Sequence, residues 1–212
     1  AEDPDGLNIN KDCGSTHLGQ LKKAVLAGHY DAGLAFDGDA DRFLAIDENG
    51  NEVDGDKLIS IFAKHMKSKN KLNNNTAVVT VMSNMGFFKF CEDNEIDCEK
   101  TKVGDRYVLE NMLENDYVIG GEQSGHIIFL KYATTGDGIL TSLMLMEAKM
   151  LTDKKLIELA APFKVFPQVL KNIRVKSKPE ARADEKVVAI VNEVAEKLGN
   201  DGRILVRESG TE

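Results

Sequence analysis

The sequence predicts an α/β protein in which a layered domain with a mixed sheet is followed by part of a smaller α+β domain. Strand-like and helix-like segments alternate over residues 17–160, which is typical of layered α/β domains. Within that range, AVVTVM (77–82) is a continuous apolar run of the kind that is buried on both faces of a sheet. After Pro162 the pattern changes to an alternating strand, a linker and an amphipathic helix. We therefore expect a domain boundary near residue 162.

Each expected element follows from the spacing of its apolar residues. Helices are expected where these residues recur every three or four positions, and strands where short apolar runs end at turn residues. The expected helices are 17–28, 55–69, 84–94, 105–115, 138–150, a further helix within 152–161, and 183–198. The expected strands are 33–36, 43–47, 77–82, 96–101, 117–121, 127–130, 166–176 and a last strand that begins at Gly202.

Two connections have a more specific prediction. Asn49-Gly50 follows the strand 43–47 and predicts a hairpin with a type I′ turn, because this pair favours positive φ at both central positions. KPEAR (178–182) is interpreted as a linker. These patterns divide the chain into a loop-rich connector (1–15), an α/β domain (16–162) and a partial α+β domain (163–212).

Composition narrows the classes of function. The chain has 212 residues, 42% of them hydrophobic, and a net charge of −8. Because nucleic-acid affinity depends on Lys and Arg side chains that displace counterions, we expect no nucleic-acid partner. No apolar run reaches the roughly 20 residues that span a bilayer, so we expect no membrane partner. Cys13, Cys91 and Cys98 lack zinc-site spacing, which predicts reduced thiols and a cytoplasmic location.

The stretch AFDGDADRF (35–43) places Asp37, Asp39 and Asp41 at alternate positions after an apolar strand. Alternate side chains of extended backbone point the same way, so we expect these carboxylates to converge. Oxygen ligands of this kind select hard cations such as Mg²⁺, Mn²⁺ or Ca²⁺. Arg42 adds a cation that suits a phosphate group. The stretch therefore predicts a Mg²⁺ site that leaves coordination positions for a phosphate oxygen and water.

Two other interpretations of this acidic stretch can be compared with the sequence. A calcium-binding EF-hand loop that starts at Asp37 requires Gly at its sixth position, where Arg42 stands, and helices on both sides. That interpretation fails. A solvated acidic loop that only ends a strand is the alternative that stays open, although acidic residues among apolar strands usually have a partner.

The loop GGEQSGH (120–126) joins two expected strands and suits a sugar. Its glycines, including Gly121, allow the backbone to approach a ligand closely. The carboxylate of Glu122 can accept hydrogen bonds from two neighbouring hydroxyl groups, and Ser124 can donate or accept one. His126 is able to titrate near neutral pH. A polar hairpin turn with a hydrogen-bonded histidine is the alternative.

The segment VRESGTE (206–212) follows the last expected strand and suits a phosphate. It combines the guanidinium of Arg207, the hydroxyl groups of Ser209 and Thr211, and backbone N–H groups left accessible by Gly210. Ser-Gly-Thr is also common in ordinary turns, which is the alternative interpretation.

Together these three loops resemble those of the α-D-phosphohexomutase superfamily. That family carries a metal loop of the form DGDADR, a sugar loop GE-x-SGH and a phosphate loop R-x-SGT, and all three occur here in that order. The resemblance spans almost the whole chain. It implies that residues 1–15 are the tail of the second domain, 16–162 the metal- and sugar-binding third domain, and 163–212 part of the phosphate-binding fourth domain.

The resemblance also implies a role for each matching residue. Mg²⁺ is the implied cofactor, and its implied ligands are Asp37, Asp39 and Asp41 together with a phosphoserine. The implied catalytic residues are Arg42 and His126, the second as an aid to proton transfer. The implied sugar-binding residues are Gly121, Glu122 and Ser124. The phosphate that is not transferred would be held by Arg207, Ser209, Gly210 and Thr211.

The form of the loops indicates a substrate class. GGEQSGH and RESGTE look most like the bacterial members that interconvert glucosamine 6-phosphate and glucosamine 1-phosphate for UDP-N-acetylglucosamine and peptidoglycan synthesis. A hexosamine phosphate is therefore the implied substrate, and members that act on mannose or glucose phosphates are the alternative. Such members often carry His where this chain has Asp105, which we interpret as a helix N-terminal residue, so the general acid or base is left open. The sequence also leaves the oligomeric state open, and a homodimer of the full-length parent is one of the alternatives.

One motif of the family is missing. Its phosphoserine lies in a Ser-His-Asn-Pro-type loop of the first domain, and the 212 residues contain no such loop. We therefore expect a fragment of an isomerase that is inactive alone, because the nucleophile is absent. Two rival functions are a Mg²⁺-dependent phosphatase or phosphotransferase with Asp37 as nucleophile, and a sugar-phosphate- or metal-binding module without catalysis. The phosphatase or phosphotransferase function gives no role to the GGEQSGH and VRESGTE loops.

Overall fold

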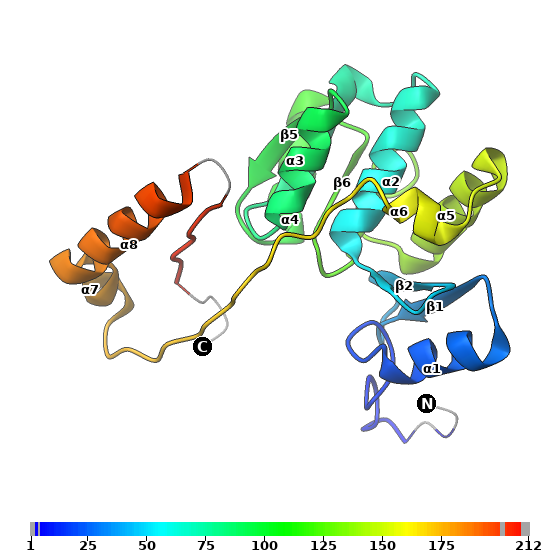
Figure 1. Ribbon diagram of the computed structural model, residues 1–212, viewed down its shortest axis with the longest axis horizontal. Coiled ribbons are helices and arrows are strands. Elements are labelled where there is room, and N and C mark those ends of the chain that lie inside the picture. Colours follow the sequence, from blue (N-terminus) through cyan, green and yellow to red (C-terminus); the bar gives the residue numbers. More distant parts are fainter. Residues whose placement is uncertain (1–2, 4, 200–201, 209–212) are drawn as a thin grey trace. The chain divides into compact units, whose positions relative to one another are not determined.

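The computed structural model describes residues 3, 5–199 and 202–208. The chain divides into two compact units, Ala1–Phe166 and Pro167–Glu212, called unit 1 and unit 2 below. Unit 1 contains both sheets, and the described part of unit 2 contains two helices (Figure 1). None of the described helices has the length and apolar character needed to cross a membrane.

The larger sheet of unit 1 has four strands in the order β5-β4-β6-β7. Their bounds are Thr76–Thr80 for β4, Asp97–Thr101 for β5, Ile119–Gly121 for β6 and Ile127–Phe129 for β7. β4 pairs in parallel with β5 and β6, whereas β6 and β7 pair antiparallel. The predicted α/β class with a mixed sheet is therefore confirmed.

Helices cover both faces of this sheet (Figure 1). α2 (Gly55–Ser68) and α3 (Met85–Asp93) pack on one face and α4 (Asp105–Asn115) on the other, whereas α5 (Gly138–Thr152) and α6 (Leu156–Ala160) pack against α2. Val78 of β4 packs with Val108 and Met112 of α4, whereas its neighbour Val79 belongs to the large cluster formed with α2 and α3. Every residue of β4 is buried because both of its faces carry helices.

The smaller sheet of unit 1 is antiparallel, with the order β1-β2-β3. It consists of β1 (Ala32–Phe36), β2 (Phe43–Asp47) and β3 (Glu52–Val53), and α1 (Gly19–Gly28) packs against β1. Phe36 pairs with Phe43 at the end of the β1–β2 hairpin where the two strands are connected. The acidic stretch is the connection between these two residues, so the sheet fixes both of its ends.

The β2–β3 hairpin lies where Asn49-Gly50 predicts it, but the predicted turn type was wrong. Gly50 N–H donates to Asp47 O at 2.9 Å, and Gly50 has φ +79°, whereas Asn49 is not among the residues with positive φ. A type I′ turn needs positive φ at both central positions. The side chain of Asp47 accounts for the difference, because it accepts hydrogen bonds from the backbone N–H groups of Asn49 and Asn51 at 2.9 and 2.8 Å.

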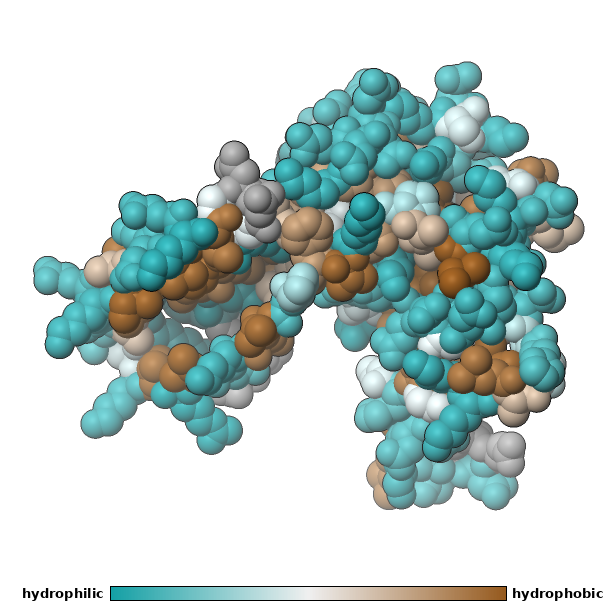
Figure 2. Space-filling view, viewed as in Figure 1, coloured by the Kyte–Doolittle hydropathy of each residue, from teal (hydrophilic) through white to brown (hydrophobic). Residues whose placement is uncertain are grey.

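The described part of unit 2 contains α7 (Lys178–Ala183) and α8 (Glu185–Leu198). α8 agrees with the predicted helix, and Figure 2 shows apolar side chains gathered over it, of which Val187, Val188 and Ile190 are exposed. The linker predicted over 178–182 was wrong. Ser177 caps α7 by accepting from Glu180 N–H, and Pro179 fits the first helical turn.

The strands predicted over 166–176 and from Gly202 were also wrong for the residues that the structure describes. Their alternating sequences are typical of strands, but a strand also needs a neighbour that supplies ladder hydrogen bonds. The described residues of unit 2 contain no strand that could serve as that neighbour. Over residues 17–161, by contrast, each predicted helix and strand occurs within a few residues of its expected bounds.

We expect Asp47→Ala to lower the free energy of unfolding by about 2–3 kcal/mol, because a buried acceptor of several hydrogen bonds is lost. Asp47 is 2% exposed, and both of its carboxylate oxygens also accept from Asn51 Nδ2. Urea unfolding monitored by circular dichroism measures the change. Asp31→Ala is the matched control, since Asp31 is exposed just before β1 and its loss should change stability by less than about 0.5 kcal/mol. Equal stability of the two variants would contradict the structural role of Asp47.

Candidate active site

The acidic stretch turns sharply between β1 and β2. Ala40 N–H donates to Asp37 O at 3.2 Å, and Ala40 has φ +58°. This turn brings one carboxylate oxygen from each of Asp37, Asp39 and Asp41 within 4.8 Å of one another. The three carboxylates therefore converge, through a turn rather than through extended backbone.

The environment of these carboxylates fits a hard divalent cation. The side chain of Asp37 is 8% exposed, and its Oδ1 accepts from Arg42 N–H at 3.1 Å. Asp39 is exposed. Asp41 Oδ1 is buried and has no hydrogen-bond partner among the residues that the structure describes. Burial of a charged oxygen without a partner is unfavourable, and a cation coordinated by the three carboxylates would remove that penalty.

The guanidinium of Arg42 lies near two carboxylates of this loop. Its Nε lies 3.8 Å from Asp37 Oδ2 and 3.9 Å from Asp41 Oδ1. Both distances allow attraction between charges but exceed the length of a hydrogen bond. The side chain is 43% exposed, so the guanidinium offsets part of the negative charge and can still reach a ligand.

His126 joins the acidic loop to the sugar loop. Arg42 and His126 form a β-bridge, and His126 Nδ1 lies 3.0 Å from Asp41 Oδ2. Gly136 N–H donates to His126 Nε2 at 3.0 Å. Because Nε2 accepts a hydrogen bond, the proton of the neutral ring lies on Nδ1, which donates to Asp41. A proton-transfer role for His126 would require one of these two contacts to break.

Asp105 approaches the same histidine. It begins α4, as the sequence indicates, and its Oδ2 lies 3.8 Å from His126 Nε2. That distance is too long for a hydrogen bond. The exposed Asp105 carboxylate therefore contributes negative charge near the ring rather than a fixed contact.

The loop TTGDG (134–138) is a part of the site that the sequence analysis missed. A Cβ atom at Gly136 would lie 2.6 Å from His126 Cε1 and 2.7 Å from Asp41 O. Gly138 N–H donates to Ala40 O at 2.8 Å. The loop therefore supports both His126 and the acidic turn. Its two glycines beside a helix-capping aspartate were a usable signal, but the sequence analysis predicted only the helix that begins at Gly138.

The sugar loop is attached to the start of α2. Gly55 N–H donates to Gln123 O at 3.0 Å, and Gln123 Nε2 donates to Asp54 Oδ2 at 3.3 Å. A Cβ atom at Gly55 would overlap Glu122 O, so only glycine allows this close approach. On the other side, Phe43 N–H donates to Gly125 O at 3.1 Å. The backbone of the loop is thus held between α2 and β2.

Two of the predicted sugar-binding side chains lie on this held backbone. Glu122 is half-buried, and its Oε1 accepts from Gly104 N–H at 3.1 Å, whereas Ser124 is exposed. Gly121 is buried in β6, between β4 and β7, so it belongs to the sheet and not to the exposed part of the loop. The loop therefore presents one carboxylate and one hydroxyl group beside the acidic loop.

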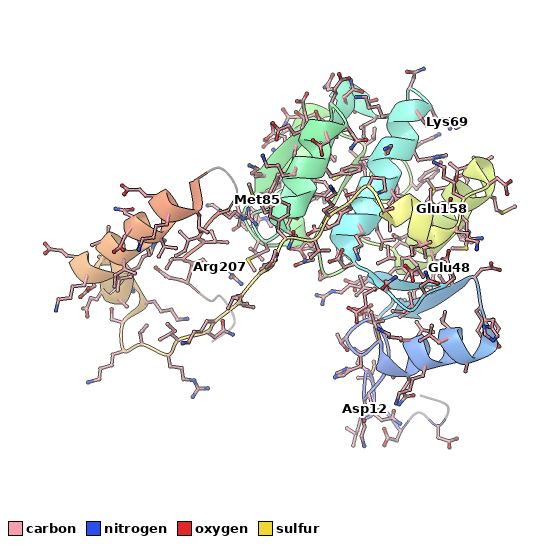
Figure 3. All side chains as sticks on the ribbon, viewed as in Figure 1. Asp12, Glu48, Lys69, Met85, Glu158 and Arg207 are labelled. Carbon is pink, nitrogen blue, oxygen red and sulfur yellow. The ribbon has the colours of Figure 1, made fainter. Side chains whose placement is uncertain are left out.

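The predicted phosphate loop is described only in part. Arg207, labelled in Figure 3, is exposed in unit 2. Ser209, Gly210 and Thr211 lie outside the described residues. The phosphate-binding role of these four residues stays a prediction.

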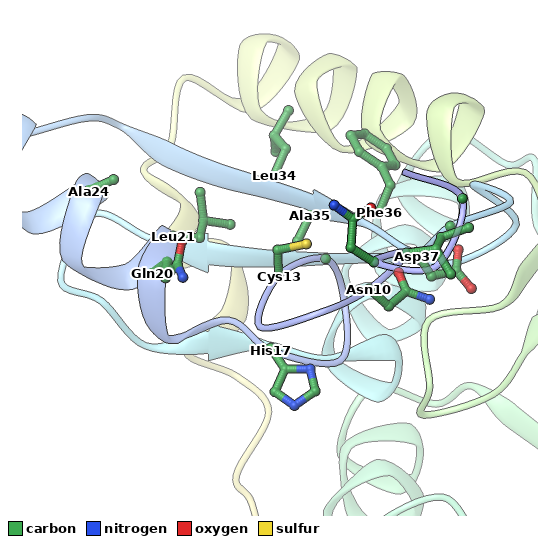
Figure 4. Close-up of a pocket in the computed structure, with 15 residues that line it drawn as sticks. Asn10, Cys13, His17, Gln20, Leu21, Ala24, Leu34, Ala35, Phe36 and Asp37 are labelled. Carbon is green, nitrogen blue, oxygen red and sulfur yellow. The ribbon is translucent and has the colours of Figure 1, made fainter. Parts of the chain in front are cut away.

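A cavity of about 690 Å³ adjoins the acidic loop in unit 1. It is lined by the N-terminal loop, α1 and β1, and Figure 4 shows Asn10 and Asp37 close together at one end of it. A Cβ atom at Gly38 would overlap the side chain of Ile9. The N-terminal loop therefore packs directly on the acidic turn, a contact that the sequence did not indicate.

Sequence comparison places the chain in a family. The family model described as "Phosphoglucomutase/phosphomannomutase, alpha/beta/alpha domain III" matches residues 54–166, which is more than half of the chain. The chain belongs to this phosphoglucomutase/phosphomannomutase family. The model of the family's C-terminal domain matches residues 170–212. The sugar loop lies inside the first match, and the acidic loop precedes it.

Curated relatives in this family carry one name. Proteins named phosphoglucosamine mutase are 58% identical in Lachnospira eligens, 55% in Acetivibrio thermocellus and 53% in Bacillus subtilis, each over 99% of this chain. The chain covers 46%, 47% and 47% of these three relatives, so it spans about half of their length.

Solved structures of the same superfamily share the fold. The structure of Aspergillus fumigatus N-acetylphosphoglucosamine mutase in complex with GlcNAc-6P and magnesium aligns with a TM-score of 0.74 and 21% identity, over 100% of this chain and 49% of that one. A putative phosphomannomutase from Thermus thermophilus aligns with a TM-score of 0.62 and 28% identity, over 68% of this chain and 33% of that one. The resemblance to the phosphohexomutases is therefore confirmed.

The two contacts of His126 predict different effects for two substitutions. We expect His126→Ala to lower the free energy of unfolding by about 2–4 kcal/mol, because it leaves a cavity and an unpaired Gly136 N–H. His126→Asn keeps an N–H group near the position of Nδ1, so it retains the hydrogen bond to Asp41. Its free energy of unfolding should therefore fall by about half as much as that of His126→Ala. Urea unfolding of both variants measures the difference. Equal losses would contradict a stabilising bond between His126 and Asp41.

Proposed function

We propose that this chain is the metal- and sugar-binding part of a phosphoglucosamine mutase, an isomerase that interconverts glucosamine 6-phosphate and glucosamine 1-phosphate in the cytoplasm. The observation that carries the proposal is the convergence of three carboxylate oxygens within 4.8 Å, next to a loop that offers sugar-binding groups. The family and the name shared by its relatives at 52–58% identity support the same reaction.

In this proposal Asp37, Asp39 and Asp41 hold Mg²⁺. The buried Oδ1 of Asp41 supports the assignment, because it receives no hydrogen bond from the described residues. When bound, the cation would neutralise charge on the phosphoryl group that is transferred. His126 positions Asp41 through Nδ1, and the TTGDG loop positions His126. Arg42 lies beside the acidic loop with its guanidinium partly exposed, so it is assigned to a phosphate oxygen.

The sugar loop would orient the hexosamine. Glu122 has one oxygen on Gly104 N–H, which leaves Oε2 to accept from a sugar hydroxyl group, and Ser124 is exposed for a second contact. The backbone at Gly121 sets the distance of this loop from β7. Holding a carboxylate in place before the substrate arrives reduces the entropy lost on binding.

The phosphate that is not transferred would be held by Arg207, Ser209, Gly210 and Thr211. Arg207 is exposed and therefore available to a dianion, and guanidinium groups bind phosphate through two parallel hydrogen bonds. The phosphate that is not transferred would then have binding groups of its own, apart from the cation. A sugar phosphate that exchanges its ends needs such a pair of sites.

A second candidate is binding without catalysis by the chain as given. It is favoured by the absence of a Ser-His-Asn-Pro-type loop from these 212 residues. A mutase reaction requires a group that carries the phosphoryl between the two positions of the sugar. The chain alone would then bind the divalent cation and the sugar phosphate, and the longer parent would catalyse the reaction.

The metal assignment predicts the effect of removing one carboxylate. We expect the chain to bind Mn²⁺, as a spectroscopic substitute for Mg²⁺, and Asp39→Asn to weaken that binding at least tenfold, because one of three charged ligands is lost. Electron paramagnetic resonance of free Mn²⁺ measures the affinity. Asp39 is exposed, so the substitution should leave the thermal stability unchanged.

Asp31→Asn is the control for this titration, since it removes the same charge from an exposed residue outside the acidic loop. Its Mn²⁺ affinity should equal that of the wild type. Equal affinity of the Asp39 and Asp31 variants would exclude the acidic loop as the cation site.

The substrate assignment predicts a preference of the longer parent. We expect it to convert glucosamine 6-phosphate at least tenfold more efficiently, in kcat/KM, than glucose or mannose 6-phosphate, and we expect the 212-residue chain alone to give no turnover. Coupled assays with each sugar phosphate measure both results. A preference for mannose or glucose phosphate would replace the proposed substrate, and turnover by the chain alone would refute the need for an additional nucleophile.

A further inference from the structure

Two of the three cysteines of the chain lie in α3 and β5, which contact each other. Cys91 lies in the last turn of α3, is 2% exposed and belongs to the large hydrophobic cluster. Cys98 lies in β5, is partly buried and packs against the same cluster. Both are free thiols in the structure. Neither residue belongs to the acidic loop or the sugar loop.

The turn after α3 brings the two cysteines together. Asn94 N–H and Ile96 N–H both donate to Cys91 O, at 3.2 and 2.9 Å. The chain therefore reverses direction directly after Cys91, and β5 runs back along α3. Alternate side chains of a strand project to the same side, so Cys98 and Lys100 share one face of β5.

The contact of Lys100 identifies that face as the one toward α3. Lys100 Nζ lies 4.3 Å from the ring centroid of Phe88, which is in α3. Phe88 precedes Cys91 by three residues, which is about one helical turn, so both lie on the same side of the helix. Cys98 lies two residues nearer than Lys100 to the turn between α3 and β5. Cys91 lies one helical turn nearer than Phe88 to the same turn. The two cysteines therefore face each other across α3 and β5, as Lys100 and Phe88 do. The thiol of Cys98, together with burial, raises the pKa of Cys91, as expected for two thiols in contact.

We propose that Cys91 and Cys98 form an intramolecular disulfide when the protein meets a small-molecule disulfide such as oxidised glutathione. Cys98 reacts first, because it is the more accessible of the two and lies on the edge strand of its sheet. Its thiolate attacks one sulfur of oxidised glutathione, the sulfur–sulfur bond breaks, and one glutathione thiolate leaves.

The second step closes the bond. Cys91 loses its proton to solvent, its thiolate attacks Sγ of Cys98, and the second glutathione thiolate leaves. Two protein thiols are oxidised and one oxidised glutathione is reduced to two glutathione molecules. Because the pKa of Cys91 is raised, its thiolate is scarce near neutral pH, so this step is slow and becomes faster as pH rises.

Mass spectrometry can detect the bond in a single peptide. The chain is incubated with oxidised glutathione, quenched in acid, treated with N-ethylmaleimide under denaturing conditions and digested with trypsin. Residues 90–99 contain no Lys or Arg, so the peptide 90–100 carries both cysteines. We expect this peptide to be lighter by two hydrogens and to carry no maleimide. A protease specific for Glu cuts after Glu92, Glu95 and Glu99, so the piece with Cys91 and the piece with Cys98 stay together only through the disulfide.

Variants of each cysteine complete the test. Cys91→Ser should retain glutathione on Cys98, because the second thiol is missing. Cys13→Ser is the matched control and should form the same internal bond as the wild type, since Cys13 lies in the N-terminal loop. Glutathione that stays on Cys98 of the wild type at raised pH, or a bond between Cys98 and Cys13, would overturn the proposal.

A second measurement does not depend on the stability of any variant. A bond between α3 and β5 restricts the unfolded chain, so the oxidised wild type should melt at a higher temperature than the same sample after reduction with dithiothreitol. Mn²⁺ affinity should be the same before and after oxidation. An unchanged melting temperature in a sample that mass spectrometry shows to be oxidised at both cysteines would contradict a bond between these two elements.

Discussion

The repulsion within the acidic loop is the constraint on which the rest of the site depends. Two unit charges 4.8 Å apart repel by about 1 kcal/mol in water and by about 3.5 kcal/mol at an effective dielectric constant of about 20. Arg42 offsets part of this repulsion, but its Nε lies 3.8 Å or more from both partners. At that distance Asp41 Oδ1 receives no hydrogen bond from the described residues, so a positive charge placed among the three carboxylates would reduce both their repulsion and the penalty of this buried oxygen.

Contacts with three distant segments hold that shape against the repulsion. The N-terminal loop packs on Gly38, the TTGDG loop donates to Ala40 O through Gly138 N–H, and His126 donates to Asp41. The second and third contacts are made through backbone and through the buried ring of His126, so they are little affected by solvent. The protein itself therefore holds the carboxylates together, and a cation that required this arrangement would lose little affinity to the entropy of ordering them.

Local patterns in the sequence were sufficient for the elements of unit 1 and for the position of the acidic loop. Apolar periodicity identifies α2 and α5, and the uninterrupted apolar run identifies β4 as a strand buried on both faces. The errors arise where a distant or non-periodic contact decides the structure. The hydrogen bonds of Asp47 replace the expected turn, Ser177 converts a linker into α7, and the strands expected in unit 2 have no described strand beside them. The support of His126 by Gly136 belongs to the same class, because ten residues separate two groups that only the fold brings together.

Glycine placement then decides how closely the two loops approach. A Cβ atom at Gly55 would overlap the backbone of Glu122, and one at Gly125 would overlap the backbone of Phe43. The sugar loop is therefore bonded to α2 on one side and to β2 on the other with no side chain between the backbones. Phe43 is also the residue at which the acidic loop ends. Because one short strand anchors both loops, any movement of the sugar loop relative to the carboxylates must break either the Phe43–Gly125 hydrogen bond or the bond between Asp41 and His126. The distance between the acidic loop and the backbone of Glu122 is thus set by these contacts, and the exposed side chains of Ser124 and Asp39 are the parts of this assembly that are free to move.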